Sequence, residues 1–159
     1  MHIDDVWRLL LAAGLGAVLG LEREYRQKPA GLRTNILIAD GSALFTIVSL
    51  KLAPSGDQSR VAGQIVTGIG FLGGGAIMRY RDTVHGMTTA ATIWVNAAIG
   101  IAAGAGQIAL ATFTAAITLV VLVVLPPIEV YFEQRAGWPD RHRPPTNRRF
   151  RRSDDKPSS

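Results

Sequence analysis

The chain has 159 residues, of which 48% are hydrophobic, with a mean hydropathy of +0.21 and a formal net charge of +5. It contains no cysteine, which excludes disulfides, thiolate metal sites and cysteine nucleophiles. The net charge does not indicate nucleic-acid binding, because eight of the 17 Lys and Arg residues follow residue 134 and no surface of alternating aromatic and basic residues is visible.

The apolar residues gather into blocks of membrane-spanning length, since a spanning helix needs about 17–25 mainly apolar residues. The five blocks are residues 6–21, 35–53, 61–78, 87–105 and 108–128. None shows the period-2 alternation of a membrane barrel, and a backbone in lipid must bond internally. We therefore expect an all-α bundle of about five transmembrane helices. Asp4 and Asp5 precede the first block, so it is expected to be a retained helix rather than a cleaved signal peptide.

Charged residues close the first block. Glu22, Arg23 and Glu24 follow it directly, and Arg33 lies across the next loop. These four residues are expected to form an ion-pair cluster on the cytoplasmic face. The cluster is either a gate or docking surface, or an ordinary solvated membrane edge.

Polar residues at membrane depth are candidates for function, because an acid at the centre of a spanning helix costs roughly 2.5–3.5 kcal/mol on insertion scales. Asp40, in the second block, is the sharpest case; it either serves a function or is solvated near the headgroups beside Arg33. Asn96 is expected either to hydrogen-bond across helices or to line a cavity. The candidate polar cavity is lined by Asp40, Asn96, Gln64, Asn35 and Thr88. Oxygen ligands suit hydrated Mg²⁺, but one acid is too few to assign a metal site, and no cofactor is expected.

Glycine dominates the third block. The residues concerned are Gly68, Gly70, Gly73, Gly74 and Gly75. In lipid, small residues let helices approach closely, so these glycines are expected to pack the bundle. The alternative is a local break of this helix beside a polar cavity.

Pro126 and Pro127 are expected to end the fifth block. Residues 1–134 then form a transmembrane domain, and residues 135–159, rich in Arg and Pro, form a disordered basic cytoplasmic tail. With five crossings, the tail and the loops after the first and third blocks place fourteen of the 17 basic residues on one side. The N-terminus is therefore expected outside and the C-terminus in the cytoplasm. The tail either binds anionic lipid or only enforces this topology.

An internal repeat is the last organisational signal. A shift of 55 residues, without gaps, superposes seven identical residues. Five of them form the pattern G-x4-Y-R-x4-G-x2-T, which starts at Gly20 and at Gly75, and the other two are Ile38 on Ile93 and Ala43 on Ala98. Such a tandem repeat of two helices predicts a pseudo-two-fold axis along the membrane normal. Chance identity, which membrane composition inflates, is the alternative.

Four ordered motifs resemble the MgtC/SapB family of bacterial inner-membrane proteins. They are GLERE at 20–24, AGLRTN at 30–35 followed by GSALF at 41–45, RVAGQIVTGIGFLGGGAI at 60–77, and HGMTTAATIW at 85–94. The resemblance implies a multi-pass protein of the inner (plasma) membrane linked to magnesium homeostasis. Many members carry a folded cytoplasmic C-terminal domain, so this chain resembles a short form. Asp40 stands where relatives are expected to have a small or apolar residue.

Two functions fit this resemblance. The first is an accessory or regulatory protein that contacts other membrane proteins, for which the family implies ATP synthase or a magnesium transporter as partners, with a homo-oligomer as a further expectation. The second is a transporter or channel for Mg²⁺ or another small solute. An enzyme is not expected, because His2, His85 and His142 all lie in terminal or loop segments and no P-loop is present.

Overall fold

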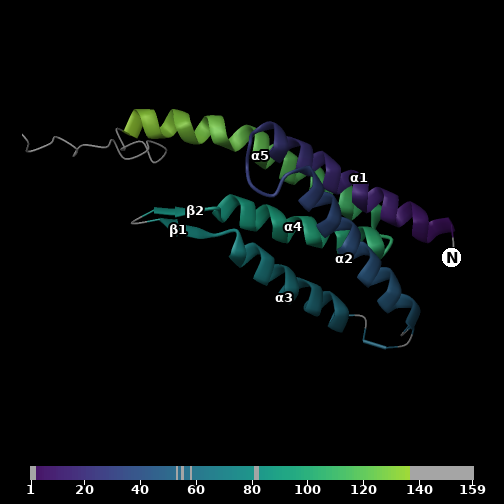
Figure 1. Ribbon diagram of the computed structural model, residues 1–159. Coiled ribbons are helices and arrows are strands. Elements are labelled where there is room, and N and C mark those ends of the chain that lie inside the picture. The colour runs from purple at the N-terminus through teal and green to yellow at the C-terminus, as the bar shows by residue number, and fades with distance from the viewer. Residues whose placement is uncertain (1–2, 53, 55, 58, 81–82, 137–159) are drawn as a thin grey trace, which may run out of the picture. The chain divides into compact units, whose positions relative to one another are not determined.

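The computed structural model describes residues 3–52, 54, 56–57, 59–80 and 83–136 (Figure 1). The helices in this part of the chain are α1 (Ile3–Tyr25), α2 (Leu32–Leu52), α3 (Ser59–Gly75), α4 (Met87–Gly104) and α5 (Ile108–Ala136). Each of the five predicted blocks is confirmed as a helix. The chain divides into two compact units, residues 1–125 and 126–159. The predicted tail falls almost entirely on residues 137–159, outside the described residues.

Helix α2 packs against both α1 and α4, and α3 packs mainly on α4. The larger buried cluster joins four helices and contains Leu19, Ala39, Ile99 and Ala115. Its members are mostly alanines, so the helix backbones lie close together. A second cluster of isoleucines and an alanine joins α2, α3 and α4.

Glycines set the close contacts of α2. A Cβ built on Gly16 of α1 would lie 2.7 Å from the carbonyl oxygen of Asn35, and one on Gly104 of α4 would lie 2.5 Å from that of Ala43. Gly20 and Gly100, one turn from each, face the α2 backbone in the same way. The GxxxG spacing in α1 and α4 thus marks real helix contacts.

Two contacts at one end of the bundle show how α1 runs relative to its neighbours. Lys51, at the end of α2, forms an ion pair with Asp5 at the start of α1. Arg8, one turn further on, donates from Nη1 to the carbonyl oxygen of Gly104 at 3.1 Å. The start of α1 therefore lies beside the ends of α2 and α4, and α1 runs antiparallel to both.

A short hairpin, which the sequence did not predict, is the one addition to the helices among the described residues. Strands β1 (Met78–Tyr80) and β2 (Thr83–His85) pair antiparallel between α3 and α4. Gly86 follows with φ +90, where a Cβ would collide with the carbonyl oxygen of Ala76. Only glycine fits this left-handed, crowded turn. The hairpin lies in the predicted loop after the third block.

The predicted end of the fifth helix at Pro126 and Pro127 is wrong, because α5 continues through both to Ala136. Proline's fixed φ is compatible with a helix, and what it removes is its N–H. The carbonyls four residues earlier, at Leu122 and Val123, thereby lose their usual donors. Arg26 supplies one replacement, since its Nη2 lies 3.1 Å from the Val123 oxygen.

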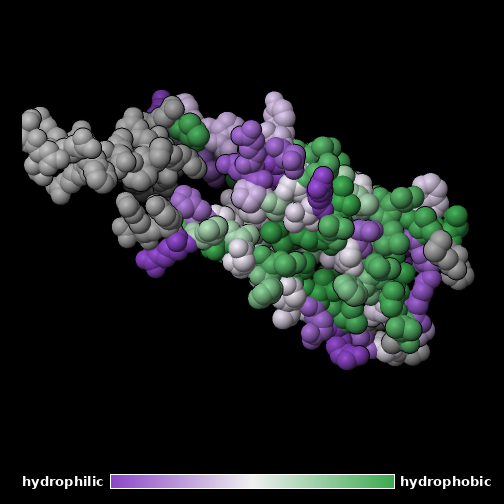
Figure 2. Space-filling model, viewed as in Figure 1, coloured by the Kyte–Doolittle hydropathy of each residue, from purple (hydrophilic) through white to green (hydrophobic). Residues whose placement is uncertain are grey.

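Three helical segments in the described residues are long and apolar enough to cross a membrane: Leu32–Leu52, Met87–Gly104 and Ile108–Phe132. Helices α1 and α3 are not among these three. Charged residues at both ends shorten the apolar part of α1, and α3 has only 17 residues and is rich in glycine. Large apolar side chains of α5 are open to the surroundings, with Phe113 66% exposed. Figure 2 shows hydrophobic residues over much of the visible face of the first unit.

Candidate functional site

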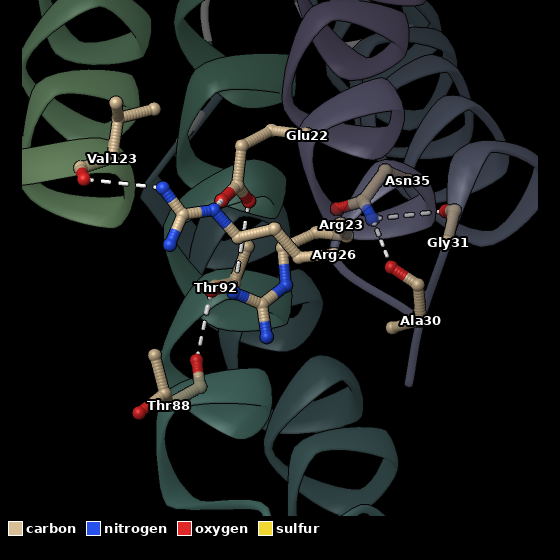
Figure 3. A network of polar contacts seen from close by, with 9 residues as sticks. All are labelled: Glu22, Arg23, Arg26, Ala30, Gly31, Asn35, Thr88, Thr92 and Val123. Carbon is tan, nitrogen blue, oxygen red and sulfur yellow. Dashed lines mark hydrogen bonds and ion pairs between the residues drawn. The ribbon is translucent and has the colours of Figure 1, made fainter. Parts of the chain in front are cut away.

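A buried charged cluster lies at the end of α1 (Figure 3). The Glu22 side chain is 6% exposed, and its Oε1 lies 2.8 Å from Nε of Arg26, four residues later and just past the end of the helix. The Arg23 side chain is equally buried, but its Nη1 is 3.7 Å from Glu22 Oε2. Glu22 therefore pairs closely with Arg26 and only loosely with Arg23.

Hydrogen bonding in this cluster is incomplete. The Arg23 Nε is buried without a hydrogen-bond partner in the described part of the chain, and so are both carboxylate oxygens of Glu22, whose contact with Arg26 is an ion pair only. Burial lowers the pKa of the Arg23 guanidinium; the neighbouring Glu22 raises this pKa and Arg26 lowers it further. A cation is thus held out of water with one distant carboxylate as its counter-charge.

The other two predicted members lie elsewhere. Glu24 is exposed, and its Oε2 accepts a hydrogen bond from the Leu32 N–H at 3.1 Å, which satisfies an otherwise free donor at the start of α2. Arg33 is exposed and makes no ion pair within the described residues. The sequence analysis missed Arg26, although its i,i+4 spacing from Glu22 is the usual signature of a helical ion pair.

An amide pair connects α2 with α4. Asn96 Nδ2 donates to the Asn35 backbone carbonyl at 2.6 Å and faces the Asn35 side-chain oxygen at 3.2 Å. Asn35 Nδ2 donates in turn to the carbonyls of Ala30 and Gly31, at 2.5 and 3.0 Å. Both asparagines are fully buried, so the pair ties the loop before α2 to the middle of α4.

A cavity with a volume of about 670 Å³ lies between α2 and α3. Most of its lining is apolar, with Thr34, Ser42 and Gln64 as the polar exceptions. The lining residues are Thr34, Leu37, Ile38, Gly41, Ser42, Phe45, Val61, Gln64, Ile65, Gly68, Ile69, Leu72 and Ile93. Gln64 is therefore the one predicted cavity residue that lines it.

The remaining predicted polar residues are separate. Asp40 is half-buried on α2, does not line the α2–α3 cavity, and makes no hydrogen bond or ion pair within the described residues, Arg33 included. Thr88 is exposed, and its carbonyl oxygen accepts from the Thr92 hydroxyl at 2.8 Å. The structure brings Asn35 and Asn96 together, while Asp40, Gln64 and Thr88 stay apart from that pair.

The glycines of α3 behave unlike those of α1 and α4. Gly73 faces Ala90 of α4, whose carbonyl oxygen lies 3.5 Å from an added Cβ. Gly68, Gly70, Gly74 and Gly75 have nothing within 4 Å of such a Cβ. Among the five predicted packing glycines, Gly73 alone contacts another described helix, and Gly68 lines the α2–α3 cavity.

Alanine- and glycine-packed helices, apolar helices of spanning length and exposed apolar side chains together define a helical membrane protein. The chain belongs to the MgtC family, whose model matches residues 9–131. This membership confirms the family resemblance carried by the four sequence motifs.

Three relatives illustrate the match. The chain is 42% identical over 132 residues to an uncharacterized protein of Synechocystis. The aligned region covers 83% of the chain and 56% of that protein. The chain is 51% identical over 102 residues to protein MgtC of Salmonella typhimurium, covering 64% of the chain and 44% of that protein. It is 47% identical over 132 residues to YhiD of Escherichia coli, which its name describes as a candidate magnesium transporter, covering 78% of the chain and 61% of that protein. The chain thus spans about half the length of these relatives, and no solved structure matches it.

Proposed function

We propose that this chain is an accessory membrane protein of magnesium homeostasis, which acts by binding helices of other membrane proteins. The observation that carries the proposal is an unpartnered small-residue face on α3. Gly63, Gly70 and Gly74 recur at intervals of seven and four residues, which places them on one side of the helix. An added Cβ at each would meet nothing within 4 Å, and Phe71 beside them is 84% exposed.

This face suits another helix better than it suits lipid. Glycines lower the helix surface, so that a second backbone can approach closely and gain van der Waals contact, as α1 and α4 do on α2. The partners that the family suggests are ATP synthase or a magnesium transporter. A second copy of this chain is a further candidate.

The proposed topology has five crossings of the bacterial inner membrane, with the N-terminus outside and the C-terminus in the cytoplasm. Two of the three basic residues at the predicted outer end make internal contacts, Lys51 with Asp5 and Arg8 with Gly104. Basic residues with internal partners oppose the transfer of their segment across the membrane less than basic residues without such partners do. The antiparallel course of α1 against α2 and α4, and the packing of α1 on α2 and of α3 on α4, fit this topology and the proposed tandem repeat.

A transporter for Mg²⁺ or another small solute is the second candidate, and Asp40 favours it. An acid on an apolar helix of spanning length is costly, and such residues often mark ion paths. The mostly apolar lining of the α2–α3 cavity favours the accessory function instead, because hydrated Mg²⁺ needs oxygen ligands.

Two measurements separate the candidates. In proteoliposomes, the accessory function predicts no Mg²⁺ influx above that of empty liposomes. Influx that rises with protein and falls for Asp40→Ala would support transport instead. In the bacterium lacking the gene, wild type and Gly14→Leu should restore growth at low Mg²⁺, and Gly70→Leu should not. Both glycines have open surroundings within the chain, so equal growth of the two variants would remove α3 as the contact surface.

A further inference from the structure

We propose that Arg23, together with Arg26, binds the oxyanion of a phosphate group at the end of α1. This inference does not depend on the chain's role in magnesium homeostasis. It begins from the charge of the buried cluster, in which two guanidiniums, +2, face one carboxylate, −1, for a net charge of +1. Glu24, the next acid along α1, is exposed and caps α2 instead.

The Arg23 side chain makes this excess charge costly. It is 5% exposed, its Nε has no hydrogen-bond partner in the described chain, and the nearest carboxylate oxygen, on Glu22, is beyond hydrogen-bond distance. Buried charges in proteins are otherwise paired and hydrogen-bonded, because removing an ion from water without compensation is strongly unfavourable. An acceptor that carries negative charge would compensate both the excess positive charge and the unpartnered Arg23 Nε.

A phosphate oxyanion fits this site in chemistry and in place. The planar guanidinium offers parallel N–H donors that match phosphate oxygens, and such pairs are among the strongest hydrogen bonds in proteins. Arg23 stands two residues after Leu21, where the apolar part of α1 ends and where the proposed topology places the lipid headgroups. Lys28, exposed in the following loop, adds further positive potential at this edge.

The cluster is approached past Arg26. The Arg26 side chain is 32% exposed, against 6% for Glu22, and it extends from Glu22 to the Val123 carbonyl (Figure 3). Donors of Arg26 that these two contacts leave free can share an anion with Arg23. The phosphate group can come from free phosphate or from a phospholipid headgroup, and both would use the same donors.

The test uses the full chain, purified and stripped of lipid in an uncharged maltoside detergent. Thermal unfolding is measured while inorganic phosphate, or phosphatidylglycerol in mixed micelles, is added against chloride at matched ionic strength. Stabilisation by phosphate identifies a free anion, and stabilisation by the lipid alone identifies a headgroup. If neither stabilises the wild type more than chloride does, the proposal is overturned.

The variant Arg23→Gln should weaken the apparent affinity for the stabilising anion at least about tenfold, the change expected when a charge-assisted hydrogen bond is lost. Arg33→Gln removes the same charge from an exposed position on the next helix and should change it less than about twofold. Equal responses of the two variants would overturn the site. Should Arg23→Gln fail to fold, Arg23→Lys takes its place; it keeps the charge but loses the planar fork, and it too should bind several-fold more weakly than wild type.

Discussion

The guanidinium of Arg26 donates to the backbone carbonyl of Val123, with 3.1 Å between Nη2 and the oxygen. In an unbroken helix that carbonyl would accept from the N–H of residue 127, but residue 127 is proline. A side chain just past the end of α1 thus replaces a hydrogen bond that α5 cannot make. The same guanidinium pairs with Glu22, so the charged cluster is tied to α5 just before its two prolines.

Because Arg26 takes the place of the N–H that Pro127 lacks, we expect energetic coupling between Arg26 and Pro127. Arg26→Ala should destabilise the wild type, because the Val123 carbonyl then has no donor. In a Pro127→Ala background, the restored N–H can bond that carbonyl within α5, so Arg26→Ala should cost less. The coupling free energy should be about 1–3 kcal/mol, as for a hydrogen bond with a charged donor.

Unfolding midpoints in detergent, measured for the two single variants and the double variant, give this coupling. Lys28→Ala, a change of an exposed cation in the same loop, is the control and should add to Pro127→Ala without coupling. Strict additivity of the Arg26 and Pro127 effects would show that the Val123 contact contributes nothing to stability.

Glu22 and Glu24 should differ sharply in their contributions to stability. Glu22→Gln leaves two neighbouring guanidiniums without a counter-charge, and breaking a buried pair typically costs about 3–5 kcal/mol. Glu24→Gln keeps a side-chain oxygen that can still accept from Leu32, and the site is exposed, so the cost should stay below about 1 kcal/mol. Thermal unfolding of the two variants side by side checks the difference, and comparable losses would mean that Glu22 is solvated.

The sequence predicted the helices well because block length and apolar composition depend only on local chain chemistry. It missed the continuation of α5, because the acceptor left free by Pro127 is satisfied by Arg26, a residue 97 positions away. The hairpin was missed because strands of three residues carry too short a pattern to read.

The candidate site was predicted only in part, because local chain chemistry determines some of its features and contacts between helices determine the others. Glu22 and Arg23 follow the apolar block directly, so their place at the end of the helix could be read from the sequence. Sequence spacing could not show that Arg33 points away while Arg26 turns inward, because that depends on how α1 meets α4 and α5. Likewise, the glycines of α3 look like those of α1 in sequence, but their environments differ.

Two glycines of α1 provide a matched test of helix packing. An alanine Cβ at Gly16 would lie 2.7 Å from the Asn35 carbonyl oxygen and 2.9 Å from the Ala39 Cβ, and both are too close. Gly16→Ala should therefore destabilise the bundle by about 1–3 kcal/mol, as overpacking does. Gly14→Ala meets nothing within 4 Å and should be neutral or stabilise by up to about 1 kcal/mol, through helix propensity. Denaturation by an ionic detergent, followed by circular dichroism, compares them; equal effects would contradict the close α1–α2 contact.

The two buried asparagines should contribute unequally to stability. Asn96→Ala removes the contacts to Asn35, and hydrogen bonds between membrane helices average about 0.6 kcal/mol, with a maximum of about 1.7. Asn35→Ala also frees the carbonyls of Ala30 and Gly31, but leaves its backbone carbonyl as an acceptor for Asn96. The larger loss is expected for Asn35→Ala, with faster proteolysis in the loop before α2. A larger loss for Asn96→Ala would mean that the α2–α4 contact contributes more to stability than the bonds from Asn35 to the loop before α2.

Asp57, in the loop before α3, should titrate below its ordinary pKa of 3.8. Its Oδ1 accepts hydrogen bonds from the Ser59 hydroxyl at 2.5 Å and from the Ser59 N–H at 3.0 Å, and both lower the pKa by favouring the carboxylate. Because the folded-state pKa lies below the unfolded one, this contribution to stability is complete above pH 3.8 and is lost as pH falls through the folded pKa. An NMR titration of the Asp57 carboxyl carbon in micelles should give a midpoint below 3.8, and Ser59→Ala should return it toward that value. A wild-type midpoint at or above 3.8 would mean that Ser59 does not hold the carboxylate at the start of α3.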